Sequence, residues 1–355
     1  MNNIEVNQFL LKLSIIVLSY NKKQGLKALL KHWRNYPVQL LVIDGSKEPF
    51  SFDENLNLNM NLNFELKYFH EPISYQERIK KATKNRSRKY TLLSADDEIH
   101  LPLGLAKSIK FLERNIEFNS CIGKSLRLIK IKNNFKLEKT YHNLDLVNNT
   151  QIYPDVLNRV VNYFDNYVCA TYYSVTRSKT WSENFKNAFD VKTSCPFAME
   201  RLVEFANIAK GKCHVHNDVS WIRNCIDQPN YSTLDRKITL SRWIKNISYK
   251  KEHNEIKNLM KNYGIKKENI DDIFLKVFKP PKKSFNMNFL RSYLMYRTFS
   301  RELINMIRKV LSLIQKKFFN KKQIGLIRNS HFISNNETVL INEFISEKHC
   351  LFKNK

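Results

Sequence analysis

Two adjacent carboxylates, Asp96 and Asp97, follow closely after the apolar segment Tyr90–Leu93, which is predicted to be a buried strand. Neighbouring carboxylates repel each other, so one of them stays protonated unless a cation relieves the repulsion. Mg²⁺ or Mn²⁺ gives that relief, and these ions commonly bind one or two carboxylates together with phosphate oxygens. An exposed acidic turn is the alternative interpretation. The strand before the pair, Pro102 and a predicted helix after it, and a strongly basic chain favour the metal site.

Acidic side chains follow two of the predicted strands. Asp44 comes directly after the apolar run Val38–Ile43 and is followed by Gly45 and Ser46. Apolar runs and amphipathic segments alternate through the first part of the chain, which predicts βαβ units and a mostly parallel sheet. Ligands bind at the carboxyl ends of strands in such sheets, so we expect the acidic groups to share one site. Strands are predicted at 14–18, 38–43, 64–69, 90–93 and 121–123, and helices at 24–33, 74–85, 102–112 and 197–209.

Three motifs occur in a fixed order: Ser14–Asn21 (SIIVLSYN), Val42–Ser46 (VIDGS), and Leu92–Glu98 (LLSADDE) with Leu101-Pro102 after it. Together they resemble GT-A glycosyltransferases of the large inverting, family-2-like group that builds bacterial surface polysaccharide and lipopolysaccharide. The resemblance covers about 12–125 well and 185–225 loosely. It implies an α/β GT-A fold, Rossmann-like, with a mostly parallel central sheet flanked by helices and an α-helical C-terminal extension.

The resemblance also implies a domain organisation. A glycosyltransferase domain is expected over 1–245, with a nucleotide-binding half at about 12–125 and an acceptor half at about 126–245. From about 246 the chain becomes rich in Lys and Asn with a helical pattern, interrupted at Pro280 and Pro281. We predict a basic helical C-terminal region over 246–355.

Roles for the donor-site residues are carried over from the family. The turn Ser19-Tyr20-Asn21 would hold the nucleoside of a nucleotide sugar, with UDP- or GDP-sugars favoured. Asp44 would accept a hydrogen bond from a base N–H such as that of uracil. Asp96 would contact the ribose and the metal shell, and Asp97 would ligate the Mn²⁺ or Mg²⁺ that bridges the diphosphate. Ser94 stands where many members carry the first Asp of Asp-x-Asp-Asp.

The family also uses a carboxylate general base near the start of a helix in the second half. That base removes the proton of the acceptor hydroxyl as its oxygen attacks the anomeric carbon. Glu200 is our first candidate, Glu204 the second and Asp190 the third. Glu200 and Glu204 lie one turn apart on the same helix face, so the sequence does not separate them. The alternative is that Glu200 pairs with a surface Lys or Arg.

Other polar residues of the second half have weaker signals. His214 and His216 would face the same side of a strand, either as a metal ligand or, more simply, as ordinary polar residues. Arg223 and Trp221 are candidates to contact the acceptor or the diphosphate. Processive synthases carry Gln-x-x-Arg-Trp, whereas this chain has Thr at the first position of 239–243. This departure favours the addition of a single sugar.

The net charge of +27, from 60 Lys and Arg against 33 Asp and Glu, requires an explanation. Nucleic acid, anionic lipid and phosphorylated ligands are the usual partners of such a charge, and a biased Asn-, Lys- and Ile-rich composition is the neutral alternative. A nucleic-acid-binding protein would interleave aromatic and basic residues on one surface, which is not seen, so no nucleic acid partner is expected. A sugar nucleotidyltransferase would carry a Gly-rich loop after the first strand, where Ser19–Gly25 has a single Gly.

The segment 291–322 predicts a basic amphipathic helix, which either binds an anionic membrane surface or docks on the catalytic domain. Six cysteines without a Cys-x-x-Cys pair, and no apolar run long enough to span a bilayer, predict a cytoplasmic protein, peripheral on the inner face of the plasma membrane if the helix binds lipid. We therefore expect an EC 2.4, hexosyltransferase-like enzyme. It would move one sugar from a nucleotide-diphosphate donor to a surface glycan or lipid-linked acceptor, with inversion.

Overall fold

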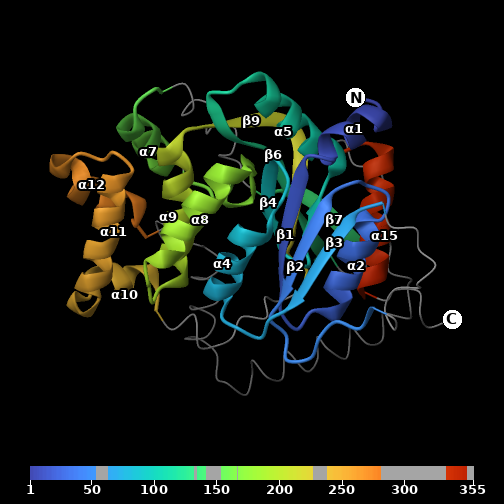
Figure 1. Ribbon diagram of the computed structural model, residues 1–355, viewed down its shortest axis with the longest axis horizontal. Helices are drawn as coiled ribbons and strands as arrows, with labels where there is room; N and C mark the ends of the chain where they lie inside the picture. Colours follow the sequence, from blue (N-terminus) through green and yellow to red (C-terminus); the bar gives the residue numbers. More distant parts are fainter. Residues whose placement is uncertain are drawn as a thin grey trace, which may run out of the picture.

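The computed structural model describes residues 1–52, 63–131, 134–140, 153–165, 167–226, 238–280 and 333–349. Among these residues a nine-stranded sheet lies at the centre, in the order β3-β2-β1-β4-β8-β6-β9-β5, with β7 paired to β6 outside this path. Helices cover both faces of the sheet (Figure 1). Within the same ranges, no helix combines the length and the apolar character needed to cross a membrane.

The half of the sheet formed first in the sequence is parallel throughout. Its strands are β1 (Leu13–Ser19), β2 (Gln39–Asp44), β3 (Glu65–His70) and β4 (Tyr90–Ser94). The four strands predicted between residues 14 and 93 are thus confirmed. The ladders align Ser19 with Asp44 and Val17 with Ser94, so the carboxyl ends of β1, β2 and β4 meet at one edge.

The pleat of β1 divides its apolar side chains between two cores. Ile16 packs with the cluster that contains Trp181 and Phe205, whereas Ile15 and Val17 pack with the cluster on the opposite face. A strand buried on both faces needs a continuous apolar run, which is the pattern that predicted it. One face is covered by α4 (Tyr75–Asn85), α7 (Val156–Asp165), α8 (Ser178–Asp190) and α9 (Pro196–Lys210), and the other by α1 (Asn3–Leu10), α2 (Lys23–Trp33) and α5 (Pro102–Arg114).

The second half of the sheet adds antiparallel pairs. The strand predicted at 121–123 is the middle of a longer strand, β6 (Phe118–Ile131), because its pairing with β9 (Lys212–Asn224) continues along most of both strands. The short strands β5 (Ile99–His100) and β8 (Val175–Arg177) pair antiparallel to β9 and to β4 and β6, and β7 (Asn134–Lys139) pairs with the end of β6. The pairing of β5 with β9 joins the acidic turn after β4 to the second half of the chain.

Within the described residues, the helices after β9 form two separate groups. The first group is α10 (Leu240–Lys245), α11 (Lys250–Asn262) and α12 (Ile270–Val277), with the 3₁₀ turns η2 (Ile247–Tyr249) and η3 (Lys267–Asn269), and it shares a core with α7 and α9. The last helix, α15 (Asn335–His349), packs beside α2 at the other end of the long axis (Figure 1). The amphipathic helix predicted at 291–322 lies outside the described residues, and the domain boundary at 245 stays a prediction.

Candidate active site

Asp96 joins the turn after β4 to the loop after β1. Its Oδ2 accepts a hydrogen bond from the Ser19 Oγ at 2.9 Å and one from the Tyr20 backbone N–H at 3.3 Å. Burial, with the neighbouring charge of Asp97, raises the pKa of Asp96 to about 6, although Lys22 and the two hydrogen bonds favour the carboxylate. Asp96 therefore fixes the relative position of the two loops. Ser94, at the end of β4, is buried and its hydroxyl donates to the Ala95 carbonyl.

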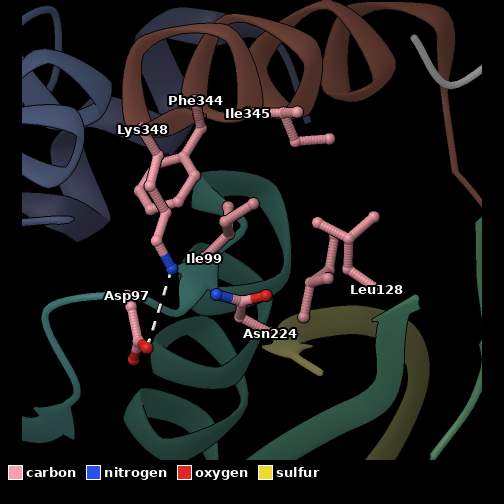
Figure 2. Close-up of a pocket in the computed structure, with 8 residues that line it drawn as sticks. Asp97, Ile99, Leu128, Asn224, Phe344, Ile345 and Lys348 are labelled. Carbon is pink, nitrogen blue, oxygen red and sulfur yellow. Dashed lines mark ion pairs between the residues drawn. The ribbon is translucent and has the colours of Figure 1, made fainter. Parts of the chain in front are cut away.

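Asp97 is held by two ammonium groups from distant parts of the chain. Lys22 Nζ donates to the Asp97 Oδ2, and Lys348 Nζ, from α15, lies 3.6 Å from the same oxygen (Figure 2). No group of three or more His, Cys, Asp or Glu side chains suited to a metal ion occurs in the part of the chain that the structure describes. In the described structure Lys22 and Lys348 compensate the charge of Asp97, and the metal role of Asp97 stays a prediction.

Glu98, the third acid of this turn, has a structural contact. Its Oε2 accepts a hydrogen bond from the Trp221 Nε1 at 2.7 Å, which ties the turn to β9. Burial, together with the charge of Asp97, raises the pKa of Glu98 to about 8, so Glu98 is mostly neutral at pH 7. Arg223 is exposed and follows Trp221 by two residues. Its positive charge opposes this rise in the pKa of Glu98.

Asp44 organises a corner formed by the loops after β1 and β2. Its Oδ1 accepts hydrogen bonds from the Ser46 backbone N–H at 2.9 Å and the Ser46 Oγ at 2.5 Å, and its Oδ2 accepts one from the Tyr68 hydroxyl at 2.9 Å. Asn21 has a φ of +54°, which Asn tolerates, and its N–H donates to the Ser46 Oγ at 2.7 Å. The sequence-predicted residues Asn21 and Asp44 are thus linked through one serine.

Arg78 is a residue of this site that sequence reasoning missed. It is 5 % exposed, and its Nη1 donates to the Ser19 carbonyl at 2.6 Å. The rings of Tyr20 and Tyr75 flank its guanidinium, each at 5.9 Å. A Cβ added to Gly45 would lie 2.6 Å from the guanidinium carbon, so glycine is needed for this close approach. The only sequence signal was a basic residue on the sheet-facing side of a helix whose other charges are solvated.

No protein-family model and no curated protein matches this chain. Solved structures do match. TarS 1–349 of S. aureus in complex with UDP-GlcNAc aligns with a TM-score of 0.52 at 13 % identity, over 75 % of this chain and 71 % of that one. TarS 1–349 without that ligand aligns at 0.50 and 12 % identity, over 75 % and 70 %.

The chain has a GT-A glycosyltransferase fold. The mannosyltransferase PcManGT of Pyrobaculum calidifontis, in complex with GDP-Man and Mn²⁺, aligns over 97 % of this chain and 88 % of its own at 10 % identity. Its TM-score of 0.40 is below the level at which a common fold is inferred.

In this GT-A fold, the two glutamates on one face of α9 have different surroundings. Glu204 is 0 % exposed, and its carboxylate accepts hydrogen bonds from the Tyr172 N–H at 2.8 Å, the Thr171 N–H at 3.2 Å, and the hydroxyls of Thr171 and Tyr163. Burial raises the pKa of Glu204 to about 7 against these hydrogen bonds. Glu204 thus anchors the 3₁₀ turn η1 (Thr171–Tyr173) inside the protein.

Glu200, one turn earlier, lies nearer the surface of the GT-A domain. It is half-buried, and its Oε1 accepts a hydrogen bond from the Tyr167 hydroxyl at 3.1 Å. Asp190, at the last residue of α8, forms a surface ion pair with Lys80 at 2.8 Å. Among the three predicted carboxylates, Glu200 therefore combines partial exposure with an oriented hydrogen bond from a neighbouring side chain.

Tyr173 packs on the tryptophan that binds the acidic turn. The Tyr173 ring lies 4.4 Å from that of Trp221, which binds Glu98. Burial raises the pKa of the Tyr173 hydroxyl. The second half of the chain thus packs an aromatic side chain beside the acidic turn.

The two histidines of β9 have packing roles. His214 stacks on Phe111 with ring centroids 3.8 Å apart, and His216 hydrogen-bonds the Ser108 hydroxyl at 2.9 Å. Burial lowers the pKa of both imidazoles. The interpretation of His214 and His216 as ordinary polar residues of the strand agrees with these contacts. Thr239, at the start of α10, caps that helix by accepting from the Arg242 N–H.

Proposed function

We propose that this protein transfers one sugar from a nucleotide-diphosphate-sugar donor to a surface glycan or lipid-linked acceptor of a bacterial cell. The observation that carries the proposal is the convergence of Ser19, Asp44 and Asp96 at the carboxyl ends of three adjacent parallel strands, with Asp97 beside them. Ligand sites of open α/β sheets occupy this position. UDP-GlcNAc is the ligand of the similar TarS structure and gives one donor to test first.

The nucleoside would bind in the corner built by Asp44, Ser46 and Asn21. Asp44 would accept a hydrogen bond from the base, because a carboxylate that already accepts three hydrogen bonds still has acceptor capacity. Ser94 and Asp96 would face the ribose. The guanidinium of Arg78 would hold the loop after β1 in position, since it donates to the Ser19 carbonyl.

Asp97, with Asp96 behind it, would hold a divalent ion, Mn²⁺ or Mg²⁺. When bound, such an ion would neutralise the charge that develops on the departing diphosphate. The chain contributes the carboxylate, its fixed position after β4, and the two ammonium groups that compensate its charge. Arg223 would add positive charge on the β9 side of the same region.

Glu200 would act as the general base in an inverting reaction. Its carboxylate would take the proton of the acceptor hydroxyl while that oxygen attacks the anomeric carbon from the face opposite the diphosphate. The Tyr167 hydroxyl would orient the carboxylate, and partial exposure would let an acceptor reach it. Glu204 is less suited because four donors already occupy its oxygens, and Asp190 because it pairs with Lys80.

Transfer of a hexose, a cytoplasmic location and peripheral attachment through 291–322 complete the proposal. They rest on the family resemblance and on sequence alone, since that segment lies outside the described residues.

A thermal-shift panel of nucleotide sugars, with and without Mn²⁺, tests the proposal. We expect one UDP- or GDP-sugar to raise the melting temperature only when metal is present, and Asp97→Asn to abolish this effect. The variant Lys276→Gln, at an ion pair on α12, is the control for a change of one charge. Equal stabilisation of Asp97→Asn by donor without metal would overturn the metal role, and no stabilisation by any nucleotide sugar would overturn the function.

A further inference from the structure

The last helix, α15, is fixed to α2 by both apolar and ionic contacts. Ile341, Phe344 and Ile345 are 0–3 % exposed and belong to the core that includes the apolar face of α2. The Glu347 carboxylate lies 2.7 Å from the Lys31 Nζ and 3.5 Å from the Lys27 Nζ. Because these contacts lie within the last three turns of α15, the position of the residue after Glu347 is well defined.

That residue is Lys348, whose side chain is 8 % exposed and points toward the acidic turn (Figure 2). Besides Asp97 and Asn224, the side chains that line the space around it are apolar: Ile99, Leu128, Ile222, Phe344 and Ile345. Charges interact more strongly beside such apolar walls than in bulk water. An ammonium group at this place therefore has a large effect on any anion at the end of β4.

A second ammonium group contacts the same oxygen. Lys22 is the residue before α2, and it donates to the Asp97 Oδ2 that Lys348 also approaches. The first turn of α2 lies directly on the acidic turn, because a Cβ on Gly25 would be only 2.7 Å from the Asp96 carbonyl. The positive end of the helix dipole thus adds to the charge of the two lysines.

Two ammonium groups that converge on one carboxylate oxygen repel each other, and a second anion placed between them relieves that repulsion. We infer that Lys22 and Lys348 form a binding site for the diphosphate of the donor, in which Asp97 holds both ammonium groups in position and α15 supplies half of the site. The inference rests on the proposed function, since it names the residues that meet the diphosphate. It makes α15 a part of the active site.

Calorimetric titration of the full chain in buffer that contains Mn²⁺, at fixed ionic strength, tests this site. The ligands are UDP, uridine and inorganic pyrophosphate, and the variants are Lys348→Gln, Lys22→Gln and Lys348→Arg. We expect each Gln variant to weaken UDP and pyrophosphate binding about tenfold, the loss typical of one charge-assisted contact, and to leave uridine binding within about twofold. Lys348→Arg should keep most of the affinity.

The control is again Lys276→Gln, which removes one positive charge at the opposite end of the molecule and should leave all affinities within about twofold. Unchanged or tighter UDP binding by Lys348→Gln, with normal binding by the wild type, would overturn the diphosphate site and leave the proposed function standing. Pyrophosphate binding that depends on Lys348, without binding of UDP, GDP or their sugars, would instead keep the anion site and overturn the function. A wild type that binds none of the ligands overturns both.

Discussion

Glu200 and Glu204 lie one helical turn apart, and we predict that substituting each affects a different property. Glu204→Gln replaces one carboxylate oxygen with an amide NH₂ group, which cannot accept from the donors around it. If the NH₂ takes the place of Oε1, the Tyr172 N–H loses its 2.8 Å acceptor inside the protein. An orphaned buried donor and a lost charge-assisted bond together cost about 2–4 kcal/mol of unfolding free energy.

Glu200→Gln should show the opposite pattern. Its half-buried carboxylate accepts a hydrogen bond from the Tyr167 hydroxyl at 3.1 Å, so the unfolding free energy of the protein should change by less than about 1 kcal/mol. Turnover should fall at least about a hundredfold, with donor binding retained, because the amide cannot take the acceptor proton.

Two assays on the same preparations decide between these outcomes. Urea unfolding followed by tryptophan fluorescence gives the free energy of unfolding, and release of nucleoside diphosphate from the donor that the thermal-shift panel selects gives turnover. Loss of turnover in well-folded Glu204→Gln, with near-normal turnover in Glu200→Gln, would refute the assignment of the base. An unfolding free energy of Glu204→Gln equal to that of the wild type would refute the anchoring role.

Two further substitutions test the surroundings of the site. Burial lowers the pKa of His100 to about 3, well below its unfolded value near 6.5, so this group stabilises the protein fully above pH 6.5 and progressively less as the pH falls toward 3. His100→Phe keeps the stack on Trp221. Between pH 6 and 4.5, the unfolding free energy measured in urea should fall by about 1.4 kcal/mol per pH unit more for the wild type than for the variant. Parallel pH profiles of the two proteins would contradict this. Gly25→Ala places a Cβ 2.7 Å from the Asp96 carbonyl, so it should displace α2 from the acidic turn and weaken UDP binding in calorimetry by about tenfold. The control Ala28→Gly, on the same helix, should lower the melting temperature without this loss of affinity. Equal UDP affinities of Gly25→Ala and the wild type would show that the close approach is dispensable.

The parallel half of the fold could be predicted because each buried strand is a continuous apolar run. Ile15, Ile16 and Val17 follow one another without a polar residue, and the structure uses them on both faces of β1. The capping box at Ser74 and Glu77 likewise marks the start of α4 in the sequence and is present in the structure. Such signals are local, so no tertiary information was needed.

The remainder of the site depends on contacts between distant residues. Lys348 meets Asp97 across most of the chain, and no spacing in the sequence relates the two. Arg78 resembles every other basic residue of its helix until its burial is known. Glu200 and Glu204 occupy the same helix face, and only the 3₁₀ turn packed against Glu204 distinguishes them. Pairing and burial, which periodicity does not encode, therefore decide these roles.

The hydrogen bonds that run from Asn21 through Ser46 to Asp44 cross-link two loops before any nucleotide arrives. A nucleoside site with cross-linked loops loses little conformational entropy on binding. Its affinity would therefore come from shape and polarity rather than from the ordering of a loop. The affinity for nucleosides with different bases would then depend on how well each base fits a preformed site. Ser46, which links the two loops, would thus determine how selective the protein is among bases.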